Sequence, residues 1–452
     1  MKTIFITIFQ GVEAKNILRT DIYKKLAAQK DLRLVFFVGS PERADYYRKE
    51  FSAPNVVYEA VNYQPGNFWD RFFGRLKFIL LRTETSNLRR RMALQESGNW
   101  LSYCFSRALN YLLAWPLVRR IARALDYRLS GNRTFAGFFD TYNPNLIFLA
   151  HLFDDAEIAF LAEAKRRGVN TVGFVNSWDK LTARAIIRIL PDRLVVFNNV
   201  VKDEALRYAD MEKEKIFVSG IPNYDWHVQH RAVSREGFCA ARGLDPQKRL
   251  IVYAPMGKAY SNSDWDIIDL LNEALKNGEI KNAQLFVRFQ PNDFTDAEEL
   301  KKRPWIKYDM PGIRFSSKRG VDWDMNFNDI KGLTDTLANA DVFVCYASSM
   351  SIDAAVFDKP AINIDFEVRE KELLSKTPTH FYKMTHYMNA VKSGGISYPK
   401  NREEFIKEIN AYLENSALDR EGRKRLVAEQ CGAMDGKAGE RIAEFLLKQI
   451  ND

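Results

Sequence analysis

The chain has 452 residues, which exceeds what one hydrophobic core accommodates and makes two domains the natural expectation. An apolar content of 46% and an aromatic content of 13% exclude an intrinsically disordered protein. The formal net charge is +9, and the four cysteines lie far apart, which excludes a disulfide scaffold and favours a reduced, cytoplasmic protein.

Short apolar runs alternate with helical patterns along the first half of the chain. The run TIFITIF (3–9) predicts a buried strand, and the N-terminus lacks the apolar core and cleavage site of a signal peptide. Further strands are expected at 32–39, 145–151, 170–176, 192–198 and 215–222, and helices at 14–29, 42–51, 155–168, after Trp178 and at 200–209. This alternation predicts a parallel sheet with helices on both faces.

The alternation stops in the polar stretch 223–249 and then starts again. The second series has expected strands at 250–255, 283–291, 341–347 and 360–366, and three helices complete the chain after residue 400. We therefore expect two Rossmann-like domains, at 1–225 and 249–452, joined by a linker at 226–248. Whether the last helix crosses back to the first domain is left open.

Two adjacent serines stand at the end of an expected strand in the second domain. Ser348 and Ser349 lie between that strand and a helix, and Asp353 lies one helical turn further on. Ligands bind at the carboxyl ends of parallel strands, and a helix N-terminus attracts anions. Plain N-capping is the alternative explanation for the serines.

Two other strand ends of the same domain carry residues suited to a phosphate. The stretch RFQP supplies Arg288, Gln290 and Pro291, and the stretch YAPMGK supplies Gly257 and Lys258. Each stretch is weak by itself, but together with the two serines they predict a diphosphate-binding cleft.

The order YAP…G, VRFQP, ANADVFVCYASSMSIDAAVFDKPAINI and DGKAGERI resembles the second domain of GT-B glycosyltransferases. It is most similar to bacterial surface-polysaccharide enzymes and to the CDP-glycerol glycerophosphotransferase-like and UDP-N-acetylglucosamine 2-epimerase-like groups, over about residues 145–450. The resemblance implies an α/β GT-B fold, with a cleft between two Rossmann-like domains and a nucleotide diphosphate held by the strand-end serines. Gln290 stands where those families often carry a histidine, so it offers no charge-assisted contact.

The resemblance also implies that the acceptor binds the first domain, which supplies the base. Glu13, Asp154, Asp155 and Asp179 follow expected strands there, with His151 beside two of them. A shielded carboxylate with a raised pKa can deprotonate an acceptor hydroxyl. The three aspartates also occupy positions typical of helix N-caps, whereas Glu13 is less easily explained as a cap. We expect no metal, with the diphosphate charge met by helix amides, Arg288 and Lys258.

The positive charge is confined to one segment. Residues 70–133 contain 13 basic and 4 acidic residues, and the rest of the chain has 54 of each. The segment is rich in Trp, Phe and Leu, and its longest uncharged run, between Arg107 and Arg119, is too short to span a bilayer. A helical insert on an anionic membrane surface and a buried helix with a solvated basic face fit equally well. Nucleic acid is the least favoured partner, because no nucleic-acid motif accompanies the charge.

The first functional hypothesis is an inverting glycosyltransferase at the inner face of the membrane. It would move a sugar from a nucleotide-activated donor to a glycan or lipid-linked acceptor, without any other cofactor. A polyol-phosphate transferase of the CDP-glycerol type and a nucleotide-sugar 2-epimerase are the alternatives on the same scaffold. A non-catalytic basic scaffold is the third hypothesis, and it predicts no nucleotide affinity.

Overall fold

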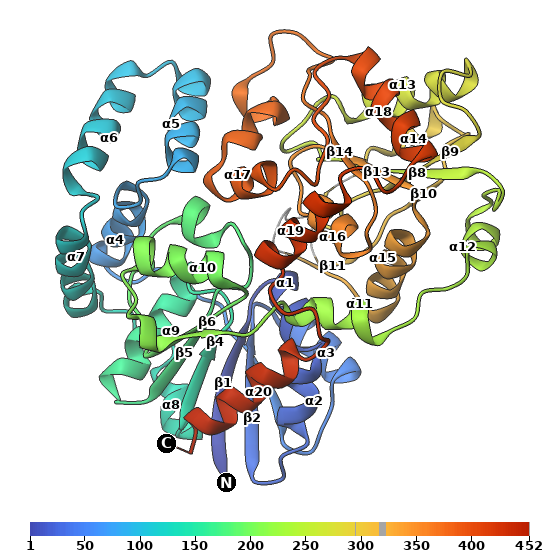
Figure 1. The fold of residues 1–452 in the computed structure, drawn as a ribbon. Helices are drawn as coiled ribbons and strands as arrows, with labels where there is room; N and C mark the ends of the chain where they lie inside the picture. The colour runs from blue at the N-terminus through green and yellow to red at the C-terminus, as the bar shows by residue number, and fades with distance from the viewer. Residues whose placement is uncertain (294, 316–321, 452) are drawn as a thin grey trace. The chain divides into compact units, whose positions relative to one another are not determined.

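Each half of the chain builds one parallel β-sheet covered by helices (Figure 1). The computed structural model describes residues 1–293, 295–315 and 322–451. They form two units, one with Met1–Arg90, Asn99–Gln229 and Cys431–Asp452, the other with Arg91–Gly98 and His230–Gln430. The two parallel sheets confirm the expected α/β class with two Rossmann-like halves.

The first unit contains a seven-stranded sheet in the order β3-β2-β1-β4-β5-β6-β7, with all pairs parallel. Its strands are β1 Lys2–Ile8, β2 Leu32–Val38, β3 Val56–Ala60, β4 Leu146–Leu149, β5 Asn170–Phe174, β6 Arg193–Val196 and β7 Ile216–Val218. The chain runs outward from β1 to β3 and then restarts at β4 on the other side of β1. This reversal makes the β1–β4 junction a topological switch point, where ligands of such sheets bind.

The helices around this sheet are short. They are α1 Gly11–Ile17, α2 Asp21–Ala27, α3 Pro41–Glu50, α8 Ala136–Tyr142, α9 Asp155–Arg166, α10 Asn199–Glu204, α11 Asp225–Gln229 and α20 Ala438–Gln449, with single turns η1 Lys180–Arg184, η2 Ala205–Ala209, η3 Lys213–Lys215 and η4 Pro222–Tyr224. Strand β3 was not anticipated from the sequence, although Val56, Val57 and Tyr58 favour a strand. The helix expected after Trp178 is wrong in extent, because only the π-helical turn η1 forms there.

Aromatic rings fill the interior between this sheet and its helices. Phe5 and Phe37 of neighbouring strands meet edge to face with ring centroids 4.8 Å apart, and Phe160 of α9 lies 4.6 Å from Phe37. Edge-to-face contacts of this kind add to the stabilisation from burial alone. They hold α9, and with it the loop that precedes α9, against the switch point.

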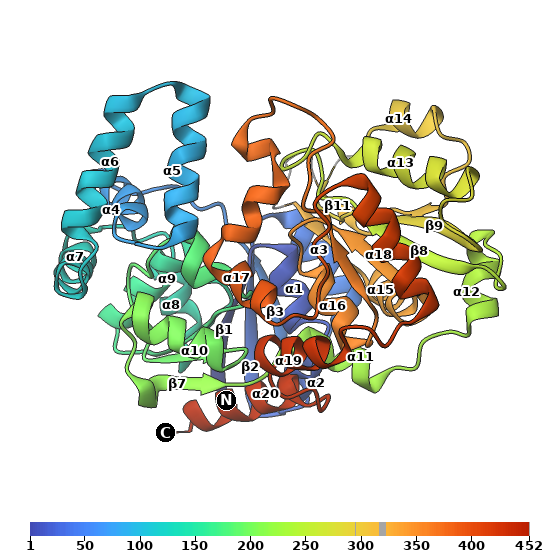
Figure 2. The ribbon, with the colours of Figure 1, turned by 45° about the horizontal axis from the view of Figure 1, so that its top comes forward.

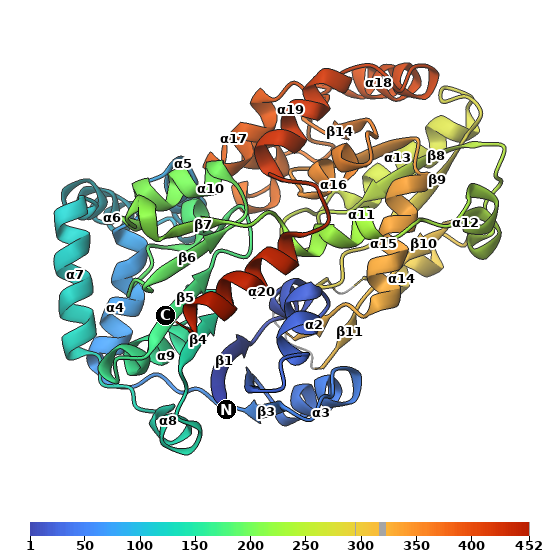
Figure 3. The same cartoon turned by 60° about the horizontal axis from the view of Figure 1, so that its bottom comes forward.

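The C-terminal segment packs on the first unit, where α20 lies beside α2 (Figure 3). Phe445 stacks on Phe217 of β7 with centroids 4.5 Å apart. The carboxylate of Asp225 accepts hydrogen bonds from the amides of Ala438 and Gly439, 3.0 and 2.7 Å away, and so caps α20.

The second unit contains a five-stranded sheet in the order β10-β9-β8-β13-β14, again parallel. Its strands are β8 Arg249–Ala254, β9 Ala283–Arg288, β10 Tyr308–Asp309, β13 Val342–Cys345 and β14 Ala361–Asn363, and β11 Ile313–Arg314 pairs antiparallel with β12 Trp323–Asp324. Its helices are α12 Arg235–Arg242, α13 Asp264–Lys276, α14 Ala297–Lys301, α15 Phe327–Asn339, α16 Met350–Val356, α17 Thr385–Lys392, α18 Arg402–Glu414 and α19 Arg420–Gln430, with η5 Leu374–Lys376 and η6 Pro378–Lys383. Its switch point lies between β8 and β13.

Between β3 and α8 the chain forms the helical insert, made of α4 Phe68–Ile79, α5 Glu84–Ser97, α6 Trp100–Leu113 and α7 Pro116–Leu129 (Figure 2). Helix α7 buries some of its charged residues and exposes others. The guanidinium groups of the buried Arg119 and Arg123 donate to the carboxylate of Asp210, at 2.5 and 2.6 Å, whereas Arg120 and Arg128 are exposed. None of the helices in the described part of the chain is both long and apolar enough to cross a bilayer.

Replacing Asp210 by alanine tests how α7 is held. The change leaves two buried guanidinium groups without their carboxylate, and we expect a loss of about 3–5 kcal/mol in the free energy of opening the insert. Hydrogen–deuterium exchange of the α7 amides measures this loss. Asp203→Ala, at an exposed position seven residues earlier, is the control and should leave α7 exchange unchanged. Equal protection of α7 in both variants would contradict this account.

Candidate active site

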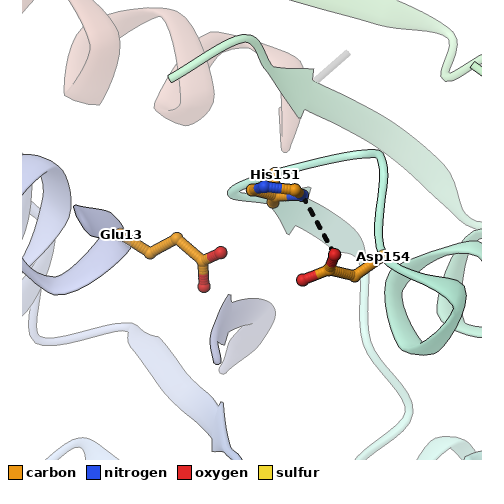
Figure 4. A group of neighbouring side chains, drawn as sticks. All are labelled: Glu13, His151 and Asp154. Atoms are coloured by element: carbon orange, nitrogen blue, oxygen red, sulfur yellow. Dashed lines mark ion pairs between the residues drawn. The ribbon is translucent and has the colours of Figure 1, made fainter. Parts of the chain in front are cut away.

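Ionisable side chains meet where β1, β4 and β5 end in the first unit. Glu13 lies in α1 just after β1, while His151 and Asp154 follow β4, and one ligand-type atom of each lies within 4.8 Å of the others. Figure 4 shows the Glu13 carboxylate directed toward the imidazole of His151 and the carboxylate of Asp154. We call Glu13, His151, Asp154 and Lys180 the acid–base cluster.

Glu13 takes part in capping α1, although the sequence made it less easily explained as a cap than the three aspartates. Its Oε2 accepts hydrogen bonds from the backbone amides of Phe9 at 2.5 Å and Gln10 at 3.1 Å, which completes a capping box at the start of α1. Its Oε1 is buried and has no hydrogen-bond partner among the described residues. Burial, with the nearby charges of Glu157 and Asp154, raises the pKa of Glu13 well above its usual value, so the carboxyl group favours its protonated form.

His151 is buried between a hydrogen-bond donor and a cation. Its Nδ1 accepts from the amide of Phe153 at 3.3 Å and lies 3.7 Å from Asp154, while its Nε2 contacts the Nζ of Lys180. Burial, followed by the charges of Lys180 and Arg184, lowers the pKa of His151 well below its usual value. Burial likewise lowers the pKa of Lys180. The lowered pKa keeps the imidazole neutral at neutral pH, which is the state that a general base needs, and it also makes the imidazole a weaker base.

The three aspartates expected at this edge lie in different surroundings. Asp154 occupies the N-cap position of α9 without capping it, and its Oδ2 accepts from the side-chain amide of Gln10 at 2.5 Å. Asp179 accepts from the hydroxyl of Ser177 at 2.6 Å and adds its charge to that of the cluster. Asp155 is instead paired with Lys77 at 2.9 Å and Arg188 at 3.1 Å, which ties the loop to the insert.

Glu13, His151 and Asp154 together also offer the ligand types of a divalent-cation site. Two features weigh against that use. Lys180 places a cationic group against the imidazole, and the raised pKa of Glu13 favours a neutral carboxyl group. The arrangement therefore suits proton transfer better than metal binding, and the expectation of a metal-independent reaction stays a prediction.

Glu157 of α9 connects β1 to the loop after β4 by hydrogen bonds. Its carboxylate accepts from the hydroxyl of Thr7 on β1 and from the amides of His151 and Leu152, the latter two at 2.9 and 2.5 Å. Because Glu157 is fully buried, its pKa is raised to about 7. These hydrogen bonds hold the backbone of His151 in place relative to β1.

In the second unit, Gly257 and Lys258 lie in the loop after β8. The amide of Gly257 donates to Asp264 at 2.8 Å, and the amide of Lys258 donates to Asp293 at 2.8 Å. Gln290, where a histidine was expected from the resemblance, turns its side-chain amide to the carbonyls of Pro255 and Met256. Pro291 follows it in the turn after β9. Gln290 thus supports this loop, and the side chain of Lys258 is exposed.

Ser348 and Ser349 follow β13 on the other side of the same switch point. The hydroxyl of Ser348 accepts from the amide of Met350 at 3.2 Å, as a capping residue does. Ser349 occupies the N-cap position of α16, yet its side chain is exposed and does not cap. The plain capping alternative therefore describes Ser348 and not Ser349.

Arg288 and Asp353 are buried in the second unit. The guanidinium of Arg288 lies 3.3 Å from the carboxylate of Asp309 and donates to the carbonyl of Asp329 at 3.1 Å. Burial lowers the pKa of Arg288 to about 10, while Asp309, Asp329 and Asp353 act in the opposite direction. Its charge is already partly balanced, which leaves Lys258 as the more accessible cation of the predicted diphosphate site.

The loop after β8 also borders a cavity of about 260 Å³ in the second unit. Gly257, Lys258 and Trp265 line it, together with Arg303 and Arg369. Among the described residues that line it, neither serine of the pair is found.

Two parallel sheets, each with polar loops at its switch point, define an α/β protein with a GT-B-like fold. Solved structures share it: a UDP-GlcNAc 2-epimerase from Neisseria meningitidis bound to UDP-GlcNAc matches with a TM-score of 0.54 and 11% identity, over 99% of this chain and 100% of that one. The wall teichoic acid polymerase TagF matches with a TM-score of 0.52 and 12% identity, over 100% and 89%.

The family follows from the sequence. The model of the CDP-glycerol:poly(glycerophosphate) glycerophosphotransferase family matches residues 190–448, more than half of the chain, and the chain belongs to this family. It is also 25% identical to a UDP-N,N'-diacetylbacillosamine 2-epimerase (hydrolyzing) of Legionella pneumophila over 294 residues, 62% of this chain and 71% of that protein. The family match includes the loops at Gly257 and Ser348 but not the acid–base cluster.

Sequence reasoning left Lys180 out of the site and gave His151 no role of its own. His151 carried a usable signal, because it directly follows a strand that ends at the switch point. Lys180 carried none, since burial of its ammonium group depends on the π-helical turn η1.

Replacing Gly257 by alanine tests the geometry of the loop after β8. Its φ is +88°, and a Cβ would lie 2.4 Å from the carboxylate of Asp293 and 2.7 Å from the amide of Gln290. We expect a loss of about 3 kcal/mol in the free energy of unfolding of the second unit. Gly278→Ala is the matched control, because its φ is +73° with open space around it, and should cost about 1 kcal/mol. Equal losses in urea titrations would refute the clash.

The raised pKa of Glu157 makes the free energy of unfolding depend on pH. Its pKa is raised in the folded state, so its protonated form stabilises the fold at low pH, and this contribution is lost as the pH rises through about 7. We expect the free energy of unfolding to fall by about 3 kcal/mol between pH 5 and 8, and Glu157→Gln to remove most of that fall. Urea titrations at both pH values measure it, with the exposed Glu214→Gln as control. A Glu157→Gln variant with the wild-type pH profile would disprove the assignment.

Proposed function

We propose that the protein transfers a polyol phosphate, with glycerol phosphate as the first candidate, from a CDP-activated donor to a hydroxyl of a glycan or lipid-linked acceptor. The observation that carries this proposal is the family match over residues 190–448. It favours the polyol-phosphate alternative over the sugar transfer that was placed first on sequence grounds. We propose that the loops at the carboxyl ends of the strands, at the switch point of each sheet, carry the reaction.

The proposed chemistry needs a base and an anion site. The acceptor oxygen attacks the phosphorus that carries glycerol, a new P–O bond forms, the pyrophosphate P–O bond breaks, and CMP leaves. We propose that His151 takes the hydroxyl proton, with Asp154, Asp179 and Glu13 setting its charge environment. Asp155 would position the loop through its contacts with Lys77 and Arg188.

For the donor, we propose that the side chains of Lys258 and Ser349 and the loop of Ser348 contact the diphosphate. Gly257, Gln290 and Pro291 would shape the loops, while Arg288 and Asp353 contribute from beneath the surface. The charge of the donor diphosphate, and the charge that develops on the leaving CMP, would then be met by fixed donors at strand ends and at the start of α16.

A hydrolysing nucleotide-sugar 2-epimerase is the second candidate. The identity of 25% over 294 residues with such an enzyme of Legionella pneumophila favours it. An epimerase of this kind requires no acceptor, so the two candidates differ in what they consume.

Identification of the released nucleotide separates the candidates. The purified protein is incubated with CDP-glycerol or UDP-GlcNAc, with and without a poly(glycerol phosphate) oligomer, and the products are separated by ion-exchange chromatography. CMP released from CDP-glycerol only with the oligomer supports the proposal. UDP released without an acceptor supports the epimerase, and acceptor-dependent UDP release supports sugar transfer. No turnover of either donor by a folded protein would refute the proposed function.

Two sets of variants separate the proposed base from the proposed donor site. His151→Asn should lower kcat by about 10²–10⁴-fold, the usual contribution of a general base, and leave the donor Kd nearly unchanged. Ser348→Ala/Ser349→Ala should weaken donor binding in calorimetry by about tenfold, or 1.4 kcal/mol. The reverse pattern, weaker binding after the His151 change and slower turnover at constant Kd after the serine changes, would invalidate these roles.

A further inference from the structure

The cavity of about 260 Å³ in the second unit has no task in the proposed function. Its wall comes mainly from the loops after β8 and β9, the first turn of α13, and α14, and the loop after β14 adds Arg369. The switch point of this sheet, with the two serines, lies instead between β8 and β13. A cavity walled mainly from the β8 and β9 loops therefore offers a separate place for a second group.

Two ion pairs hold charged side chains of the wall in fixed positions. Arg303, just after α14, donates to both carboxylate oxygens of Asp269 in α13, at 2.7 and 2.5 Å. Arg369 donates to both oxygens of Asp266, at 2.5 and 3.2 Å. A guanidinium has more N–H groups than one carboxylate accepts, and a carboxylate has spare lone pairs. Each pair can therefore still bond to a ligand.

The charge of the wall does not suit an anion. Among the described residues that line the cavity, three are basic and five are acidic. Such a wall repels a phosphate group. The carboxylates do not require a cation either, because each already accepts a hydrogen bond or an ion pair; they belong to Asp264, Asp266, Asp293, Asp296 and Glu299. A neutral ligand with hydroxyl groups, which donate and accept, matches this wall best.

Trp265 adds a flat apolar surface to the same wall. The guanidinium of Arg303 lies 4.9 Å from the centroid of its ring, and the ring of Phe289 lies 5.7 Å away. Both neighbours also line the cavity, so the indole is held by packing. An aromatic ring offers apolar contact to the C–H groups of a sugar, while the fixed donors and acceptors beside it suit the hydroxyl groups.

Two buried polar atoms in the wall segments have no hydrogen-bond partner among the described residues. They are the Oγ of Ser263, a residue only 1% exposed, and the Oδ1 of Asn292. Ser263 lies between the lining residues Asn262 and Asp264, and Asn292 directly precedes Asp293. An unpaired buried polar atom costs about 1–3 kcal/mol. A hydroxyl-rich ligand that reaches these atoms would remove that cost.

We propose that this cavity binds one neutral sugar residue of a glycan acceptor. The inference rests on the proposed function for its role, which is to hold part of the acceptor in the second unit, whereas the binding itself needs no donor. It narrows the acceptor to a glycan that contains an uncharged sugar. The cavity is smaller than the roughly 300–1,000 Å³ of sites for drug-sized ligands, which suits a single ring rather than an oligosaccharide.

Saturation-transfer NMR on the whole protein tests the sugar site. The probes are glucose, N-acetylglucosamine and glucose 6-phosphate. We expect transfer to at least one of the two neutral sugars. Glucose 6-phosphate should bind at least about tenfold more weakly, or by 1.4 kcal/mol, because its phosphate meets an acidic wall. Absence of transfer to both neutral sugars, or stronger binding of the phosphorylated sugar, overturns the proposal.

Variants of the wall assign the binding to this cavity. Asp266→Asn/Arg369→Gln removes an ion pair whose side chains are 38% and 45% exposed, and it should weaken sugar binding by at least about tenfold. Glu279→Gln/Arg402→Gln is the matched control, because this pair is similarly exposed, at 33% and 44%, and neither residue lines the cavity. The control should bind like the wild type.

Trp265→Phe is a second wall variant, which keeps an aromatic ring but shortens the apolar surface, and it should also weaken sugar binding. Circular dichroism checks that all variants are folded. If both wall variants bind the sugar as well as the control does, the site lies elsewhere and the proposal fails.

Competition with CDP-glycerol separates this inference from the proposed function. The sugar signal should stay unchanged when CDP-glycerol is added, because the serine pair does not line the cavity. Displacement of the sugar would make the cavity part of the donor site and would overturn the inference. Sugar binding without turnover of CDP-glycerol or UDP-GlcNAc refutes the proposed function and leaves the sugar site in place. Normal release of CMP without sugar binding refutes the inference alone.

Discussion

One buried network of charges connects the parts of the first unit. Arg188 lies between Asp126 of α7 and Asp155 of α9, and Lys77 of α4 bonds to Asp155 and to the carbonyl of Phe153. Removing Asp126 or Arg188 would leave its buried partner without this ion pair, at a cost of several kcal/mol. The insert and the loop that carries His151 and Asp154 are therefore held by the same ion pairs. Through them, the helical insert is joined to the edge that is proposed to deprotonate the acceptor.

The two sheets share one topological feature, a switch point at the carboxyl ends of their strands. In each, the strand order reverses beside the first strand, at β1–β4 and at β8–β13, so loops separate there and leave room at the carboxyl edge. The first unit places titratable groups there, of which Glu13, His151 and Lys180 are buried. The second places Gly257, Lys258 and two serines there, which offer amides, hydroxyls and one exposed ammonium group. The proposed proton transfer and the proposed anion binding are thus assigned to loops of the same topological kind.

The family match and the acid–base cluster carry different information. The match covers the loops that are proposed to bind the donor, and it identifies a family of glycerophosphotransferases that use CDP-glycerol. The cluster lies outside residues 190–448, so its role is argued from local chemistry: a buried imidazole kept neutral by burial and by Lys180. Phosphoryl transfer leaves little covalent chemistry for the protein and depends on positioning and charge. The family match and the acid–base cluster are both consistent with phosphoryl transfer. The fold itself does not identify the reaction, because an epimerase structure has a similar fold.

The amino-acid sequence determined the α/β class, the two halves, the carboxylates and serines at strand ends, and the confinement of the net charge to 70–133. These follow from local periodicity and from the rule that parallel strands end at one edge. The tertiary structure decided the rest, because it depends on which distant charges meet. In α7, Arg119 and Arg123 are paired with Asp210, and Asp126 is paired with Arg188. Leu117, Ile121 and Leu125 are therefore exposed, although the apolar stripe of a surface helix normally faces the core. Only the fold brings Lys180 into contact with His151 and Lys77 into contact with Asp155. The adjacent carboxylates of Asp154 and Asp155 therefore have different partners, which the sequence does not reveal.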